Sequence, residues 1–189
     1  MDADLEQLQE ALERHRPADQ REAEDAAAIL AFTRRHARPF DRAIAEGHLT
    51  GSALVVADDG SAVLLLRHRK LQRWLQPGGH GEPGEARGED VALREALEET
   101  GLAGLRLHPR APRPLDVDVH DIPARPGEPA HQHLDLRYLV LAPAGAVHER
   151  CQDETDDLRW FDWDALPGLG LDPGLLRAFA KARHLLDAD

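Results

Sequence analysis

Apolar residues recur at helical spacing in the first quarter of the chain. Leucines stand three or four positions apart over residues 5–12, and a second helical pattern covers residues 19–36. Pro39 ends this second pattern, and residues 40–46 are expected to form a short third helical segment before a glycine. Because no chemical motif lies here, residues 1–47 are predicted to be an N-terminal helical extension, packed on the rest of the chain or on a second copy.

The pattern then changes to β-type runs. Residues 48–57 and 61–69 are two runs rich in branched apolar side chains, as is typical of strands. The Asp58-Asp59-Gly60 sequence between them predicts that they form a hairpin. A final helix is expected to begin at Asp172, an N-cap residue followed by a proline. Further short strands are predicted at residues 104–108, 115–121, 131–140 and 158–161. Strands and helices mixed in this order predict an α/β sandwich.

The run at residues 131–140 has two contrasting faces. In a strand, alternate side chains share a face, so His131, His133, Asp135 and Arg137 would lie together opposite four apolar residues. A face this polar, in a sheet that is otherwise apolar, suggests the wall of a pocket. We therefore predict that His131, His133 and Asp135 contact the substrate. Two alternatives stay open: a solvated strand face, and a zinc site that uses both histidines. No cysteine partner or helical histidine pair completes a zinc site in the sequence.

A helix that ends near Gly101 carries a concentrated acidic face. Glu95, Glu98 and Glu99 fall within an arc of roughly 100°. Like charges at this spacing repel, and acids near a helix C-terminus are opposed by the helix dipole. A divalent cation would resolve this conflict, whereas a solvated acidic helix is the simpler alternative. The opposite side, which is expected to pack, carries Leu93, Ala96 and Leu97.

The residues upstream of this helix make a longer pattern. Gly78 and Gly79 form a permissive turn, and Glu85 follows Gly79 after five residues. The whole stretch resembles the Nudix box, and eight positions match: Gly79, Glu85, Arg94, Glu95, Glu98, Glu99, Gly101 and Leu102. One departure is that eight residues, rather than seven, separate Glu85 from Arg94. The spacing from Arg94 to Leu102 is intact, so the functional role is assigned to the helix glutamates rather than to Glu85.

The resemblance implies a Nudix-type α/β/α sandwich with a mixed sheet over residues 48–189. It also implies hydrolysis of a nucleoside diphosphate linked to another moiety, with Mg²⁺ or Mn²⁺ as cofactor. By the same resemblance, the metal would be held by Glu95, Glu98, Glu99 and the Gly79 carbonyl. Arg94 would orient Glu85 and the helix, and Gly79, Glu85 and Gly101 would shape the motif.

Two further site predictions concern loops on either side of the motif. Glu98 would take the proton of the attacking water, or a residue of the acidic loop 148–157 would do so by resemblance to the family. Glu154 is the candidate in that loop, with Glu149 and Asp153 as alternatives. A basic cluster at residues 67–73, which includes Arg69, precedes the glycine turn and could contact substrate phosphates. A solvated strand end is the alternative for this cluster.

Composition sets outer limits on the function. The chain has 189 residues, 42% of them hydrophobic, and a formal net charge of −12. This is typical of one globular domain with an appendage, and it argues against non-specific binding to nucleic acid or an anionic membrane. A small phosphorylated substrate stays compatible, because metal ions screen the charge. We see no signal peptide or membrane span, so a cytoplasmic location is expected, and a homodimer is left open.

Cys151 is the only cysteine, so an internal disulfide is excluded. Cys151 also matters for the first of two alternative functions, an isomerase and a regulatory nucleotide-binding domain. An isoprenoid diphosphate isomerase on the same fold would need a cysteine nucleophile, and only Cys151 could supply it. A regulatory, non-catalytic Nudix domain that binds a nucleotide is the other alternative, but it would not need every acidic residue of the box.

Overall fold

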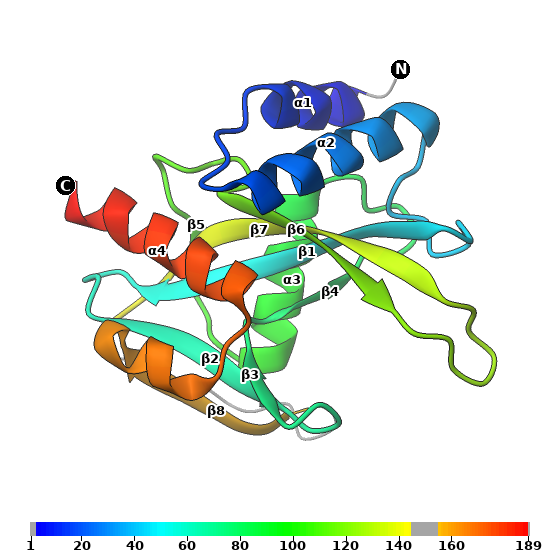
Figure 1. Ribbon diagram of the computed structural model, residues 1–189. Coiled ribbons are helices and arrows are strands. Elements are labelled where there is room, and N and C mark those ends of the chain that lie inside the picture. The colour runs from blue at the N-terminus through cyan, green and yellow to red at the C-terminus, as the bar shows by residue number, and fades with distance from the viewer. Residues whose placement is uncertain (1–2, 145–154, 189) are drawn as a thin grey trace.

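The computed structural model describes residues 3–144 and 155–188 (Figure 1). Its helices are α1 (Ala3–Glu13), α2 (Gln20–Arg35), α3 (Gly88–Thr100), α4 (Pro173–Asp187) and a 3₁₀ helix, η1 (Trp163–Leu169). Its strands are β1 (Gly47–Ala57), β2 (Ala62–His68), β3 (Arg73–Leu75), β4 (Gly78–His80), β5 (Arg106–Leu107), β6 (Asp116–Ile122), β7 (His131–Ala142) and β8 (Thr155–Asp162). None of the helices in this described part is long and apolar enough to cross a membrane.

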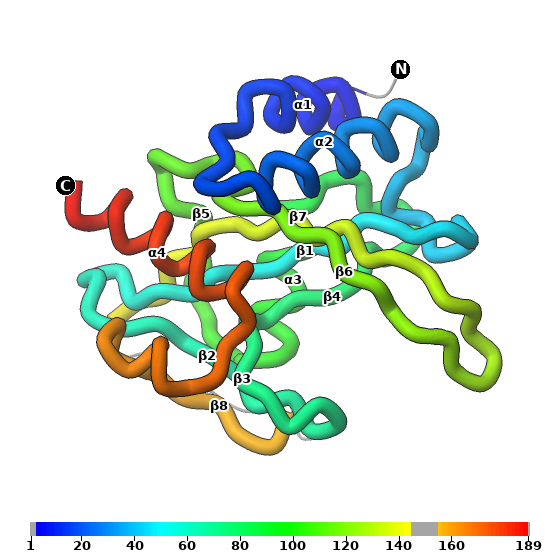
Figure 2. Tube along the Cα trace, in the orientation of Figure 1, coloured from blue at the N-terminus to red at the C-terminus, as the bar shows by residue number. Residues whose placement is uncertain are grey.

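The strands form one mixed sheet around a parallel pair. The main order is β3-β2-β1-β7-β5, while β4 pairs with β1, β6 with β7 and β8 with β2. β1 and β7 are parallel and pair along their length from Gly47↔Gln132 to Ala57↔Ala142, whereas the other pairs are antiparallel. The chain trace shows β1 and β7 side by side through the middle of the molecule (Figure 2).

Helices cover both faces of this sheet (Figure 1). Alternate residues of β1 point to opposite sides, so Leu49, Ala53 and Val55 join the core shared with α3. Leu54 and Val56 point the other way, into a second core beneath α4. The arrangement confirms the predicted α/β/α sandwich.

Small residues let α3 lie directly on β1. A Cβ atom added to Gly51 would be 2.6 Å from the carbonyl oxygen of Gly88. The side of α3 that includes this contact is the buried one, and it consists of Gly88, Val91, Ala92, Ala96 and Thr100. The expectation that Leu97 packs in the core was therefore wrong, because Leu97 lies outside this stripe and is 49% exposed. Gly101 ends the helix as predicted, with φ of 66°.

The N-terminal helices are present, and they pack on the α3 side of the sheet beside β6 (Figure 1). The Arg21 guanidinium donates a hydrogen bond to the carbonyl of Val119 in β6, 2.9 Å away. Residues 40–46 form turns, not the expected third helix. Such a short segment nucleates poorly, and the Pro39 carbonyl accepts a hydrogen bond from the amide of Leu49 in β1.

The strand predictions were confirmed in position, but their pairing differs from a simple hairpin. β1 and β2 are paired at Val56↔Val63, and β2 otherwise pairs with β3 and β8. The strands β3 and β4 were not expected, because three residues are too few to show the alternation of apolar and polar positions that predicts a strand. Asp172 caps α4 as predicted, accepting a hydrogen bond from the Leu175 amide.

Candidate functional site

The glutamates of α3 lie against the glycine turn at β4. A Cβ atom added to Gly79 would stand 2.5 Å from a carboxylate oxygen of Glu95, so a larger residue here would displace this carboxylate. The amide of Gly78 donates a hydrogen bond to Glu99, 2.9 Å away. The side chain of Glu98 is 57% exposed. We call Glu85, Glu95, Glu98 and Glu99 the glutamate face.

Arg94 connects this face to the loop before the helix. Its Nε and Nη2 atoms each lie 3.0 Å from an oxygen of Glu85, and Nη1 lies 3.0 Å from Glu95 and 3.2 Å from Glu98. Nη2 also donates to the His80 carbonyl at 2.7 Å. The hydrogen bond from Arg94 lowers the pKa of Glu85 below its ordinary value. The extra residue between Glu85 and Arg94 therefore does not separate the two side chains.

The donor set on the glutamate face fits a hard divalent cation. Carboxylate and backbone carbonyl oxygens are the ligands that Mg²⁺ and Mn²⁺ prefer, and the close approach of Glu95 to the Gly79 backbone brings such oxygens together. The assignment of Glu95, Glu98, Glu99 and the Gly79 carbonyl as metal ligands stays a prediction. Glu154, the other candidate base, lies outside the described residues, as does Cys151.

The polar wall predicted on β7 is present, and the register of β1 extends it. His48 pairs with His133, Thr50 with Asp135 and Ser52 with Arg137, all on the face away from α3. Asp135 is only 2% exposed and accepts hydrogen bonds from Thr50 at 2.9 Å, Ser52 at 2.8 Å and Arg137 at 3.1 Å. These contacts hold Asp135 inside the wall, and its contact with substrate stays a prediction.

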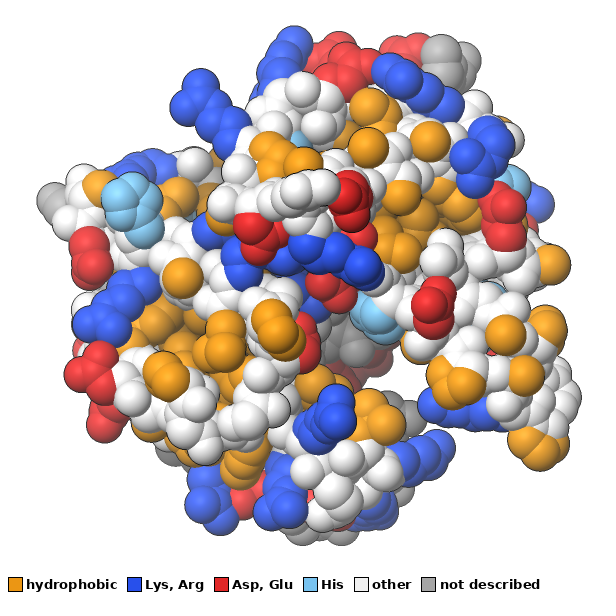
Figure 3. Space-filling model, viewed as in Figure 1, with side chains coloured by type: hydrophobic (Ala, Val, Ile, Leu, Met, Phe, Trp, Pro, Cys, Tyr) orange, Lys and Arg blue, Asp and Glu red, His pale blue; other side chains and the backbone are white. Residues whose placement is uncertain are grey.

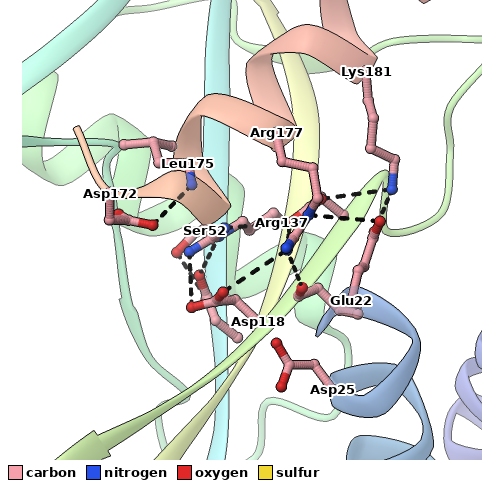
Figure 4. Close-up of polar contacts among 12 residues, drawn as sticks. Glu22, Asp25, Ser52, Asp118, Arg137, Asp172, Leu175, Arg177 and Lys181 are labelled. Atoms are coloured by element: carbon pink, nitrogen blue, oxygen red, sulfur yellow. Dashed lines mark hydrogen bonds and ion pairs between the residues drawn. The ribbon is translucent and has the colours of Figure 1, made fainter. Parts of the chain in front are cut away.

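A buried ion-pair network adjoins this wall and was not foreseen from the sequence. Arg137 contacts Asp135, Asp116 and Asp118 at 3.1–3.3 Å. Arg177 and Lys181 of α4 reach the same region, where they meet Glu22 of α2 (Figure 4). Arg177 also contacts Asp116 of β6. We call these seven residues the ion-pair network: Glu22, Asp116, Asp118, Asp135, Arg137, Arg177 and Lys181. Their sequence positions are too far apart for local spacing to reveal it.

Histidines gather at the other end of the wall. The Nε2 atom of His133 lies 3.1 Å from Nε2 of His80 and 3.3 Å from Nε2 of His131. His48 completes the group from β1, where burial and the nearby histidines His80 and His131 lower its pKa to about 4. Burial lowers the pKa of His133 further, so both rings are neutral at neutral pH. The surface is hollowed between α4 and the β6–β7 hairpin, with histidine at its wall (Figure 3).

The basic cluster lies apart from these contacts, on the turn between β2 and β3. Arg69 donates a hydrogen bond from Nε to Asp156 at 2.9 Å, and both side chains are partly exposed. The structure therefore brings Arg69 to the start of β8. Its predicted contact with substrate phosphates stays a prediction.

The family model of the NUDIX domain matches residues 47–182. The chain belongs to the Nudix hydrolase family. This membership confirms the expected family and the expectation of a pyrophosphohydrolase, which rested on the glutamates and glycines of residues 79–102.

Relatives and solved structures agree with this assignment. The chain is 39% identical over 117 residues to a Bacillus subtilis protein named "Putative 8-oxo-dGTP diphosphatase", covering 62% of this chain and 68% of that one. It is 32% identical over 132 residues to a Mycobacterium tuberculosis protein named "Putative 8-oxo-dGTP diphosphatase 3", spanning 66% of this chain but only 56% of the relative. The fold is similar to that of a C. elegans Ap4A hydrolase, with a TM-score of 0.60, 16% identity and coverage of 75% and 98%.

Proposed function

We propose that this Nudix hydrolase cleaves a pyrophosphate bond in a nucleotide derivative, a nucleoside diphosphate linked to another moiety, with Mg²⁺ or Mn²⁺ at the glutamate face. The observation that carries the proposal is the convergence of Glu95 and Glu99 on the Gly78–Gly79 backbone, braced by the Arg94–Glu85 pair. When bound there, the cation would neutralise phosphate charge and lower the pKa of an attacking water.

The residues of the chain have distinct parts in this reaction. Glu95 and Glu99 are held against β4 and would bind the cation. Glu98 is more open to solvent and would accept the proton of the water whose oxygen attacks phosphorus, while the anhydride oxygen leaves with the bond electrons. Arg94 would keep Glu85 and the helix in position. The two products would each carry a phosphate group.

An oxidised purine nucleoside triphosphate is the first substrate to test, because the names of the Bacillus and Mycobacterium relatives specify 8-oxo-dGTP. Ordinary nucleoside triphosphates, dinucleoside polyphosphates and nucleotide sugars complete the panel. Each compound is incubated with the full chain and Mg²⁺ or Mn²⁺, and phosphate is measured after coupling to a phosphatase.

The decisive variant is Glu98→Gln. Its side chain is largely exposed, so the fold is expected to persist while turnover falls by about 10²–10⁴-fold. Wild-type protein that binds nucleotides tightly but turns over none would contradict the hydrolase and favour the regulatory alternative. Product release that survives Glu98→Gln undiminished would contradict the assigned role of Glu98.

A further inference from the structure

The histidine cluster lies on the opposite face of the sheet from the glutamates. Successive residues of β4 point to opposite sides, so Gly79 faces Glu95 while His80 faces His48 and His133. The ligand atoms of His48, His80 and His133 all lie within 4.8 Å of one another. Three strands, β1, β4 and β7, therefore each contribute one imidazole to the same spot.

His48 has an unmet bonding requirement. The residue is 2% exposed, and neither ring nitrogen has a hydrogen-bond partner among the described residues. A buried polar group left without a partner destabilises the folded state. Its ring nitrogens thus point to a ligand that the protein atoms do not supply.

Hydrogen bonds among the rings cannot satisfy both contacts of His133 at once. The Nε2 atom of His133 lies within hydrogen-bond distance of two other Nε2 atoms, those of His80 and His131. A neutral imidazole nitrogen carries either one proton or one lone pair, so it completes one of these contacts. A cation among the rings would use the lone pairs together.

His131 is already prepared to offer a lone pair. Its Nδ1 atom lies 2.9 Å from the carbonyl oxygen of Pro129, which can only accept a hydrogen bond. Nδ1 must therefore carry the proton, and Nε2, which faces His133, is unprotonated in the neutral ring. A hydrogen bond from the distant ring nitrogen to a carbonyl is how proteins orient histidine ligands of metals.

The geometry points to a zinc site formed by His48, His80 and His133, with His131 beside it as the fourth ligand. Imidazole nitrogens bind Zn²⁺ at about 2.0–2.1 Å, which places tetrahedral ligands roughly 3.3 Å apart. The contacts of His133 with His80 and His131, at 3.1 and 3.3 Å, already have this spacing. Nitrogen ligands select Zn²⁺ over Mg²⁺, so this site and the glutamate face take different ions.

Zinc here would hold together the elements that carry the glutamate face. His80 follows Gly79 directly, and its carbonyl accepts the hydrogen bond from Arg94. A cation that joins β4 to β1 and β7 therefore fixes the backbone on which Glu95 and Glu99 rest.

The test measures Zn²⁺ binding to the full chain in excess Mg²⁺, which occupies the glutamate face. Wild-type protein is expected to bind one Zn²⁺ per chain and to give Co²⁺ the visible absorption of a four-coordinate site. Zinc is also expected to raise the melting temperature, because it binds the folded state. His133→Ala and His80→Ala are expected to weaken Zn²⁺ binding at least about 100-fold, and His131→Ala about tenfold, as fewer ligands remain.

Two controls keep the result interpretable. His184→Ala, which removes an exposed histidine on α4, is expected to bind Zn²⁺ as wild type does. His80 is only half-buried, so His80→Ala tests the site even where His133→Ala fails to fold. The zinc site would be overturned by wild-type protein that does not bind Zn²⁺, or by equal affinity in His133→Ala, His80→Ala and wild type. Binding that is abolished by Glu98→Gln instead would also overturn it.

Discussion

Two acid-rich regions lie on opposite sides of the central sheet and differ in what surrounds them. In the ion-pair network, Glu22 and Asp116 are fully buried and meet the cations of α4, as Figure 4 shows for Glu22. On the glutamate face, Glu98 is largely exposed, and Arg94 bridges to Glu85 at the edge of the helix. Buried charges must be paired inside the protein, whereas the open side of the glutamate face is accessible to a cation from solvent. The buried acids therefore hold the fold together, whereas the exposed acids are those that we propose to serve the chemistry.

The largest effect is expected on activity, from Glu95→Gln. Removing a carboxylate that would bind the cation should lower kcat/KM by about 10³-fold, since such a cation is worth several kcal/mol. Stability should stay within about 0.5 kcal/mol or rise, because like-charge repulsion along α3 is relieved. Steady-state kinetics and urea unfolding check both parts, with Asp90→Asn on the same helix as control. A large loss of stability would place Glu95 with the structural acids.

The matching change in the ion-pair network is Arg137→Met. It leaves Asp116, Asp118 and Asp135 without the buried guanidinium that contacts all three. The free energy of unfolding should fall by about 3–5 kcal/mol. Urea unfolding measures it, and Arg183→Met, which removes an exposed partner of Asp164, should cost less than about 1 kcal/mol. Equal effects of the two substitutions would contradict the structural role of the network.

A smaller effect is expected from Gly79→Ala, which alters the glutamate face without removing a charge. The added Cβ would displace the flexible end of Glu95. A shift of about 1 Å in a reacting group can cost up to about 100-fold, so kcat should fall roughly 10- to 100-fold with little loss of stability. Gly168→Ala, where a Cβ meets open space, is the control. Unchanged kcat would show that the position of Glu95 is not critical.

The smallest effect concerns the pH dependence of stability. Burial would raise the pKa of Glu22, but hydrogen bonds from His15, Lys181 and the Ala18 amide outweigh it and hold the pKa well below its ordinary value of 4.5. A depressed folded-state pKa contributes stability above pH 4.5 that is lost as the pH falls towards the folded value. Burial raises the pKa of Asp116, which acts in the opposite direction and reduces the net loss.

Glu22→Gln should therefore flatten the fall in unfolding free energy below pH 4.5 by about 1 kcal/mol. Urea unfolding at a series of values between about pH 3 and pH 7 measures how the free energy of unfolding depends on pH. Glu24→Gln, two residues further along α2 on its exposed side, serves as the comparison. A profile that coincides with wild type would remove Glu22 from the acid response.

Much of the site's local structure could be predicted because it depends on short spacings. The i, i+3 and i, i+4 positions of Glu95, Glu98 and Glu99 place them together on any helix, and Gly101 marks its end. The two faces of β7 follow from the period of two. The burial of Leu97 was mispredicted, because which side of α3 packs depends on the close contact of Gly88 with Gly51.

The sequence by itself determined the family, the acidic helix and the order of strands and helices, since each rests on residues near one another in the chain. Only the tertiary structure decided that His48 and His80 join His133, and that Arg177 meets Asp116. The parallel register of β1 and β7 places His48 beside His133, and the pairing of β4 with β1 adds His80. The packing of α4 brings Arg177 to Asp116. Both depend on contacts between distant segments, which no local period in the sequence encodes.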